Sequence, residues 1–239
     1  MQNNTTLATI LSHRSIRHFT EQPIAEDVFQ TLMQAAIHAS TSNHLQCVSI
    51  IRVTDKNLRK QIRELSGMSY VESCPEFIVF CADFNKHYQL EPNGQLDWAE
   101  VSLIGAVDTG IAAQNVLLAA ESLGLGGVYI GALRNNIEAV AEILSLPKYC
   151  VPLVGMCLGY PAQDPDLKPR LPTELFCYEN SYQTLDKQAL ENYNAELSAY
   201  YQARTGEMRI WQDAITGTLA QPVRPQILPF FNKQGLLKR

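Results

Sequence analysis

The stretch Val101–Leu125 has the sequence VSLIGAVDTGIAAQNVLLAAESLGL and is the most apolar part of this chain. It reaches the length of a membrane span, but four charged or amide side chains interrupt it: Asp108, Gln114, Asn115 and Glu121. Those groups would be costly in lipid. We therefore predict a buried central helix that begins at about Val101 and ends at the glycine cluster Gly124–Gly127, with its polar groups meeting partners in a core or an interface.

Strand-like and helix-like patterns alternate on both sides of this helix. Apolar or β-branched runs predict four strands, at Gln46–Val53, Glu76–Ala82, Gly127–Gly131 and Val151–Leu158. Helical spacing and capping residues predict helices at Pro23–Ala39, from Asp55 to about Leu65, at Asn135–Leu144 and at about Lys187–Ala203. Strands separated by helices indicate a mixed α/β or α+β domain with a central sheet covered on both faces.

Length and composition favour a globular enzyme or binding protein. The 239 residues, 46% hydrophobic and 18% charged, suffice for one large domain with a substantial core. A formal net charge of -5 disfavours a nucleic-acid binder. Cys47, Cys81 and Cys157 lie in strand-like runs and no Cys-x-x-Cys pair occurs, which indicates reduced core thiols. The opening Met1–Thr6 lacks the features of a secretory signal, so we expect a cytoplasmic protein.

The densest cluster of chemically active side chains is HRSIRHF, at His13–Phe19. It combines two guanidiniums, a hydroxyl and two imidazoles within seven residues of an acidic protein. Arginine offers planar, bidentate donors to phosphate oxygens, so the segment suits a phosphate and a polar ring edge. A solvated basic turn is the alternative, because short basic runs are often plain surface.

A second basic site, Lys168 with Arg170, lies in the proline-rich loop Asp164–Pro172. Proline stiffens this backbone, which lowers the entropy lost when the two cations bind an anion. The alternative is a surface loop in which Asp166 pairs with one of the cations.

Other patterns exclude several enzyme classes. The glycine cluster lacks the third glycine of a dinucleotide-binding G-x-G-x-x-G and precedes a strand. Walker A, Gly-x-Ser-x-Gly, His-Glu-x-x-His and paired-cysteine motifs are missing, so we predict no metal site. At the strand end Tyr129–Ala132, Gly131 would let backbone amides approach a flat ligand. His38 and His87 are interpreted as helix-surface or structural residues, and Tyr200 and Tyr201 as packing residues. The apolar tail Pro225–Phe231 is expected to pack on its own body or on a partner.

Nearly the whole chain also resembles the larger NADPH-preferring, oxygen-insensitive nitroreductases and the NADPH-flavin oxidoreductases. The resemblance rests on six blocks in order: His13–Phe19, Leu45–Cys47, Phe80–Phe84, Ala120–Gly131, Leu133–Val140 and Asp164–Pro172. Blocks of this length in this order are highly specific to the family.

The resemblance implies an α+β fold in which a nitroreductase-like central mixed sheet is flanked by helices. Two chains would form an interlocked homodimer with FMN at the interface. Residues 1–239 would form a single FMN-dependent domain. A C-terminal extension, about residues 180–239, would pack on the partner subunit and on the nucleotide site, which would account for the apolar tail.

The family also implies which residues hold FMN. The expected set is His13, Arg14, Ser15, Ile16 and Arg17 in the basic segment, Thr41 and Ser42 in a hydroxyl-rich turn, Ser69, the backbone of Tyr129, Ile130, Gly131 and Ala132 along the isoalloxazine, and Lys168 and Arg170 at the phosphate. Ser69 stands where the family carries a glutamine, in a stretch that is shorter here. The resemblance thus joins two basic clusters that the residues alone do not connect.

NADPH and the electron acceptor have fewer expected ligands. Arg204 matches the arginine that the family uses for the extra phosphate of NADPH, and Arg209 is a second candidate. From the residues alone, both arginines also suit a solvated helix end. His44 occupies a position near the substrate face that is commonly aromatic in relatives. Because the flavin carries the chemistry, we predict no protein nucleophile or general acid.

The implied function is a two-electron, oxygen-insensitive reduction of nitroaromatics and quinones by NADPH, with ping-pong kinetics. A flavin reductase that supplies reduced FMN is a second hypothesis, and a non-catalytic flavin-binding protein is a third. The expected partners are a second copy of the chain and a small-molecule acceptor, with neither nucleic acid nor membrane.

Overall fold

The computed structural model describes residues 5–239, so residues 1–4 of the opening stretch considered for a signal lie outside the described part. The chain divides into two compact units. The first comprises the chain up to Pro165 together with Arg224–Arg239, and the second comprises Asp166–Val223. A single domain over the whole chain stays a prediction.

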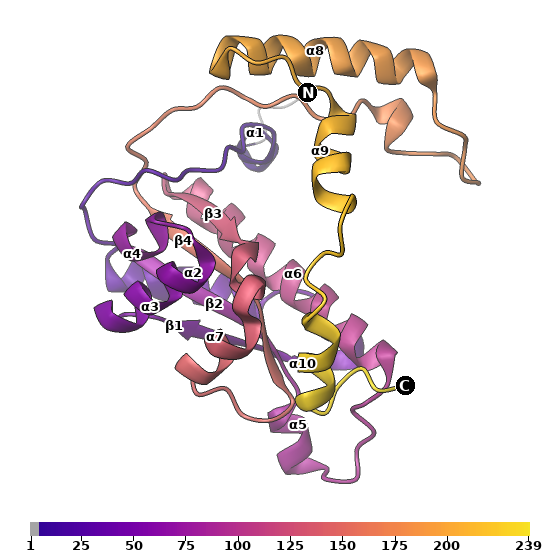
Figure 1. The fold of residues 1–239 in the computed structure, drawn as a ribbon. Coiled ribbons are helices and arrows are strands. Elements are labelled where there is room, and N and C mark those ends of the chain that lie inside the picture. Colours follow the sequence, from indigo (N-terminus) through magenta and orange to yellow (C-terminus); the bar gives the residue numbers. More distant parts are fainter. Residues whose placement is uncertain (1–4) are drawn as a thin grey trace. The chain divides into compact units, whose positions relative to one another are not determined.

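The four predicted strands form one sheet in the first unit (Figure 1). They are β1 Val48–Arg52, β2 Glu76–Asp83, β3 Gly126–Ile130 and β4 Cys150–Gly159, in the order β1-β2-β4-β3. The α+β class is confirmed. The expected mixed sheet is wrong, because all three pairings among the described residues are antiparallel. Strand direction depends on how each connection crosses the sheet, which the apolar pattern of a strand does not encode.

Alternating side chains of β2 supply core residues to both faces of the sheet. Ile78 and Phe80 join the cluster beneath two helices, α2 Glu26–Ile37 and α6 Ala99–Ser122. Phe77 and Val79 join the cluster beneath α3 Lys56–Ser66 and α7 Ile137–Ile143. Every residue of β2 is buried, so the sheet is covered on both faces, as predicted.

The central helix α6 is a core helix, as predicted. It is the one helix within residues 5–239 that has the length and hydropathy of a membrane span, yet it packs against α2 and the sheet. The helix ends at Ser122, and Gly124 follows with φ +80°, a conformation that favours glycine. Asp108, Gln114, Asn115 and Glu121 each have a hydrogen-bond partner within the chain, and for three of them the partner is an expected site residue.

Local signals position the smaller helices of the first unit. Asp55 caps α3 by accepting hydrogen bonds from the backbone nitrogens of Asn57 (2.7 Å) and Leu58 (3.0 Å), as predicted. The helix predicted before Pro147 consists of a 3₁₀ segment, η2 Gly131–Asn136, followed by α7. Short helices also occur at α1 Thr5–Leu11, α4 Tyr70–Ser73 and α5 Asn85–Leu90.

The apolar tail packs on the body of its own chain. Helix α10, Ile227–Lys233, buries Phe230 and Phe231 in a cluster with Phe84 and Ile137. Of the two alternatives for the tail, the structure therefore supports packing within the chain, and these side chains need no partner subunit to cover them. Packing of the remaining extension, residues 180–223, on a partner stays a prediction.

The second unit contains η3 Thr173–Leu175, α8 Lys187–Thr205 and α9 Trp211–Leu219. Helix α8 is predicted, and Asp186 caps it by accepting from the backbone nitrogens of Gln188 and Ala189. It buries Tyr193 and Leu197. Helix α9 is not predicted, because Gly217 and two threonines lower its helix propensity.

The cysteines have the state that the sequence predicts. All six are free thiols, and five of them are buried, among them Cys47, Cys81 and Cys157.

The buried side chain of Arg59 ties α3 to the segment before β2. It is 8% exposed, and its guanidinium donates to the carbonyl oxygens of Val53 (2.6 Å), Cys74 (2.6 Å) and Pro75 (3.2 Å). Arg59→Met would leave these oxygens without donors. We expect the free energy of unfolding, measured by urea titration, to fall by about 3 kcal/mol.

A matched control lies on the same helix. Arg63 donates to Glu72 (2.9 Å), and its side chain is 40% exposed. Because exposed ion pairs contribute little, Arg63→Met should lower the free energy of unfolding by less than about 1 kcal/mol. Equal losses in the two variants would contradict the role assigned to Arg59.

Candidate functional site

The basic segment His13–Phe19 is extended and lies beside the sheet. The backbone nitrogen of Ile16 donates to the carbonyl oxygen of Gly127 (3.0 Å), and that of Thr20 donates to Tyr160 (2.9 Å). These bonds fix the segment next to the start of β3 and the end of β4.

Two further features hold this segment in place. Oε1 of Gln163 accepts hydrogen bonds from the backbone nitrogens of Arg17 (3.2 Å) and His18 (2.8 Å). Gly126 permits close approach to the sheet, because a Cβ there would lie 2.5 Å from Cγ1 of Ile16. The cations are therefore presented from an ordered backbone, which argues against the alternative of a solvated basic turn.

The first two basic side chains each have a carboxylate partner. Nη1 of Arg14 donates to Asp164 and to the carbonyl oxygen of Pro165 (3.1 Å), and Nδ1 of His13 lies 2.5 Å from Oε1 of Glu121. Arg14, Glu121 and Asp164 line a cavity of about 420 Å³. A guanidinium that already binds one oxyanion has the donors that a phosphate requires.

Arg17 differs from Arg14 in its surroundings. Its side chain is exposed, and Nη1 lies 3.5 Å from the carbonyl oxygen of Ser15. Within residues 5–239 no carboxylate pairs with it. The charge of Arg17 is therefore available to an anion from outside the segment.

The strand end Tyr129–Ala132 has a polar side chain that points toward α6. The hydroxyl of Tyr129 donates to Oε1 of Gln114 (3.1 Å). Burial, with a smaller contribution from the charge of Glu121, raises the pKa of Tyr129 to about 12. The phenol therefore stays protonated near neutral pH and remains a donor.

Arg134 lies beside this strand end, although the sequence analysis did not include it. A Cβ on Gly131 would lie 3.3 Å from Nη2 of Arg134, and Nη1 donates to the carbonyl oxygen of Leu153. Burial, with the nearby charge of Arg224, lowers the pKa of Arg134. A half-buried cation next to the expected flavin-lining backbone is thus an additional candidate for the site.

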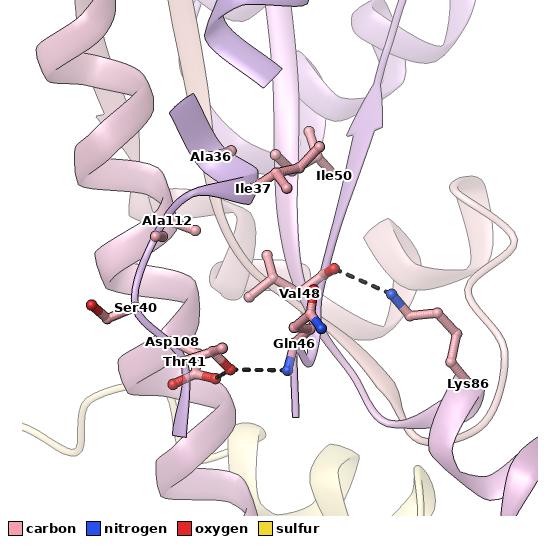
Figure 2. A pocket seen from close by; sticks show the side chains of 11 residues that line it. Ala36, Ile37, Ser40, Thr41, Gln46, Val48, Ile50, Lys86, Asp108 and Ala112 are labelled. Atoms are coloured by element: carbon pink, nitrogen blue, oxygen red, sulfur yellow. Dashed lines mark hydrogen bonds between the residues drawn. The ribbon is translucent and has the colours of Figure 1, made fainter. Parts of the chain in front are cut away.

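Thr41 and Ser42 belong to a turn that is bound to α6. Thr41 donates from its hydroxyl to Asp108 (2.6 Å) and lines a cavity of about 370 Å³ (Figure 2), and the backbone nitrogen of Ser42 donates to the same carboxylate (3.2 Å). His44 lies in the same turn, in η1 Ser42–His44, and its Nε2 is 3.0 Å from Nε2 of Gln46. Two expected flavin ligands and the expected substrate residue therefore come together on one turn.

Ser69 is the expected ligand with the weakest support. It precedes α4, and its carbonyl oxygen accepts from the backbone nitrogen of Glu72 (3.2 Å). Its hydroxyl makes no hydrogen bond in the described part of the chain, and none links it to the basic segment.

The two histidines interpreted as helix-surface or structural residues make local contacts. His38 contacts the carbonyl oxygen of Gln34 (2.8 Å), and His87 contacts that of Leu45 (2.7 Å).

In the second unit, Lys168 and Arg209 meet at Tyr201. Nζ of Lys168 donates to the Tyr201 hydroxyl (2.7 Å), and the guanidinium of Arg209 lies 5.7 Å from the ring centroid. All three line a cavity of about 360 Å³. Arg209 also pairs with Glu207 (2.9 Å), which together with Tyr201 raises the pKa of Arg209. Tyr201 therefore contacts two cations in addition to its packing role.

The other two expected cations of this unit lie apart from that cavity. Arg204 donates to the hydroxyl of Tyr200, one helical turn away. Arg170 is exposed and has no hydrogen bond or ion pair among the described residues. No ion pair of Asp166 with Lys168 or Arg170 is present there either, so the alternative of a loop tied by Asp166 has no support.

Four residues of the candidate site were not expected from the sequence: Asp108, Glu121, Gln163 and Asp164. Each accepts a hydrogen bond from an expected site residue. The polar interruptions of Val101–Leu125 were a signal for Asp108 and Glu121, because polar groups in a core helix need partners. Gln163 and Asp164 lie in a loop where nothing in the sequence distinguishes them from surface residues.

Family models cover almost the whole chain. The model described as "Nitroreductase family" matches residues 10–76 and 70–160. The model described as "Nitroreductase family, C-terminal domain" matches residues 168–239.

Curated relatives and solved structures agree with these models. The chain is 50% identical over 239 residues to the NADPH-flavin oxidoreductase of Vibrio harveyi, which covers 99% of this chain and 100% of that one. It is 51% identical over 237 residues to the oxygen-insensitive NADPH nitroreductase of Salmonella typhimurium, covering 98% and 99%. The structure of the NADPH:FMN oxidoreductase from Vibrio harveyi complexed with NAD+ superposes with a TM-score of 0.94 at 50% identity, covering 99% and 100%. That of the NfrA1 nitroreductase from B. subtilis superposes with a TM-score of 0.93 at 36% identity, covering 98% and 100%.

Proposed function

Because the chain belongs to the nitroreductase family, we propose that it is an FMN-dependent oxidoreductase that oxidises NADPH and reduces nitroaromatics, quinones or free flavin. Two relatives, 50% and 51% identical to this chain, are named NADPH-flavin oxidoreductase and oxygen-insensitive NADPH nitroreductase. A third relative, at 38% identity, is named FMN reductase (NADPH). These names support an oxidoreductase that uses NADPH and a flavin.

The basic segment fits the phosphate of FMN, and this fit is the observation that carries the proposal. Arg14 lines a cavity of about 420 Å³ and binds a carboxylate, while Arg17 is exposed without one. Phosphate offers the same kind of acceptor with more charge. His13, Ser15 and Ile16 share the ordered backbone, and Lys168 and Arg170 are proposed as further phosphate ligands.

The isoalloxazine is proposed to lie along Tyr129–Ala132, with Thr41, Ser42 and Ser69 as further contacts. Gly131 fits this role because its lack of a side chain leaves the backbone accessible to a flat ring. Bound FMN would supply the hydride and electron transfer chemistry. The chain's own residues then have to bind the nucleotide, orient the acceptor and hold the ring in place.

The choice of electron acceptor is tested by comparing turnover with different acceptors. The flavin oxidoreductase and the nitroreductase are equally similar to this chain, so the relatives do not separate the two activities. Purified FMN-loaded protein should therefore be assayed with NADPH and, in turn, nitrofurazone, a quinone and free FMN. We expect turnover with all three and parallel double-reciprocal lines, since NADPH and the acceptor would occupy the same place in turn. Intersecting lines would contradict this order of binding.

The preference for NADPH gives a prediction about two arginines. Arg204→Ala should raise the KM for NADPH far more than that for NADH, by the equivalent of roughly 1 to 3 kcal/mol, because a charge-assisted phosphate contact is lost. Arg209→Ala is the matched comparison, since Arg209 lies with Lys168 at Tyr201 while Arg204 binds Tyr200. Equal losses with both nucleotides in the Arg204 variant would reject its assignment.

A homodimer is proposed because α6 leaves one apolar stripe uncovered. Leu103, Val107 and Ile111 are 59%, 58% and 38% exposed and recur one helical turn apart. Exposed apolar stripes of this kind mark protein interfaces. Light scattering should give twice the chain mass of 26.7 kDa, and the mass of one chain at assay concentration would contradict the dimer.

The proposal also includes a cytoplasmic location. Buried free thiols such as Cys74 and Cys157 suit a reducing compartment.

A further inference from the structure

Asp108 is a buried carboxylate whose role neither the sequence nor the family resemblance explains. It lies in the middle of α6 and is 3% exposed. No cation pairs with it within residues 5–239, since Lys86, which lines the same cavity, contacts Asp83 (3.7 Å) and the carbonyl oxygen of Val48 (3.3 Å). A charge buried without a counter-ion is unfavourable unless hydrogen bonds compensate it.

The compensating donors all come from the turn at residues 41–46 and from Cys47, which follows it. Thr41 donates to Oδ2 from its hydroxyl (2.6 Å), Ser42 donates to Oδ1 from its backbone nitrogen (3.2 Å), and the Cys47 thiol lies 3.4 Å from Oδ2. Burial, with a contribution from Asp108, raises the pKa of Cys47 to about 12, so the thiol keeps its proton and can donate. One carboxylate therefore binds donors on both sides of residues 43–46, and Figure 2 shows its contact with Thr41.

The turn is strained and needs such a restraint. Asn43, His44 and Gln46 have φ values of 48°, 59° and 51°, in the left-handed region that non-glycine residues avoid. The Thr41 hydroxyl also accepts a hydrogen bond from the backbone nitrogen of Gln46 (2.9 Å). A chain of hydrogen bonds thus runs from Asp108 through Thr41 to Gln46. Strained backbone persists only where its surroundings fix it, and it is common at functional sites.

A carboxylate serves this purpose better than an amide. Two oxygens accept from separate donors of the turn, whereas the NH2 group of an asparagine would face another donor. The charge is therefore retained although burial disfavours it.

We propose that Asp108 is a positioning residue that clamps the Thr41–Gln46 turn and so sets the placement of Thr41 and Ser42 toward the flavin and of His44 toward the acceptor. This inference rests on the proposed function for its flavin and acceptor. The clamp itself rests only on contacts within the chain.

The test compares Thr41→Val and Asp108→Asn with a matched control. Ser49 donates from its hydroxyl to Asp83, a buried carboxylate, at the same 2.6 Å, and Ser49→Ala removes that bond away from the turn. Thr41→Ser keeps the hydroxyl and should therefore keep the slow exchange of the Ser42 and Gln46 amides. For each protein, hydrogen exchange of the Ser42 and Gln46 amides, the Kd and visible spectrum of bound FMN, and the kcat and KM for a quinone are measured.

We expect amide exchange at Ser42 and Gln46 to accelerate about tenfold in the Thr41→Val and Asp108→Asn variants, as for a lost hydrogen bond. FMN Kd and acceptor KM should rise by a similar factor, with a shifted flavin spectrum. Ser49→Ala also loses one 2.6 Å hydrogen bond to a buried carboxylate and should show none of these changes.

Two results would overturn the inference. Unchanged exchange in both variants would reject the clamp. Faster exchange with unchanged Kd, spectrum and acceptor KM would reject its functional role and leave Asp108 as a stability residue. Failure of the wild-type protein to bind FMN would reject the proposed function instead, and the exchange rates would still decide whether the clamp exists.

Discussion

Helix α6 is buried between α2 and the sheet, and this burial determines how several distant segments are held. A helix in that position must satisfy its polar side chains within the protein. Asp108, Gln114 and Glu121 do so by holding three separate pieces of the site: the turn at Thr41, the strand end at Tyr129 and the basic segment at His13. The same helix therefore builds the core and orients the expected ligand contacts. Its exposed apolar stripe lies on another face, where a second subunit is proposed to bind.

Much of the fold follows from short-range signals in the sequence. Asp55 and Asp186 mark helix starts, the apolar runs mark four strands, and the apolar stretch around Val116 marks the core helix. These signals work because capping and burial act over a few residues. Features that depend on residues far apart in the sequence are harder to predict. The antiparallel sheet and the packing of Phe230 and Phe231 against the body of the chain depend on how segments cross in space, and α9 forms despite its poor local helix propensity.

The candidate site also contains some residues that could be predicted from local sequence and others that depend on distant contacts. The basic segment and the Tyr129–Ala132 strand end could be predicted, because arginine and glycine have distinctive chemistry there. The residues that hold these segments in place could not be predicted. Gln163 accepts hydrogen bonds from two backbone nitrogens and Asp164 accepts one from Arg14, yet in the sequence both look like ordinary loop residues. The expected cations of the second unit also group differently from their assigned ligands, since Lys168 lies with Arg209 and not with Arg170.

Binding of FMN and its reduction by NADPH define the proposed function. An anaerobic titration of the FMN-loaded protein with NADPH, followed by the visible absorption of the flavin, tests both steps. We expect about one equivalent of NADPH per flavin to remove the absorption of the oxidised form, and we expect added quinone to restore it. A bound flavin that stays oxidised in excess NADPH would contradict the proposed function and would favour a non-catalytic flavin-binding protein.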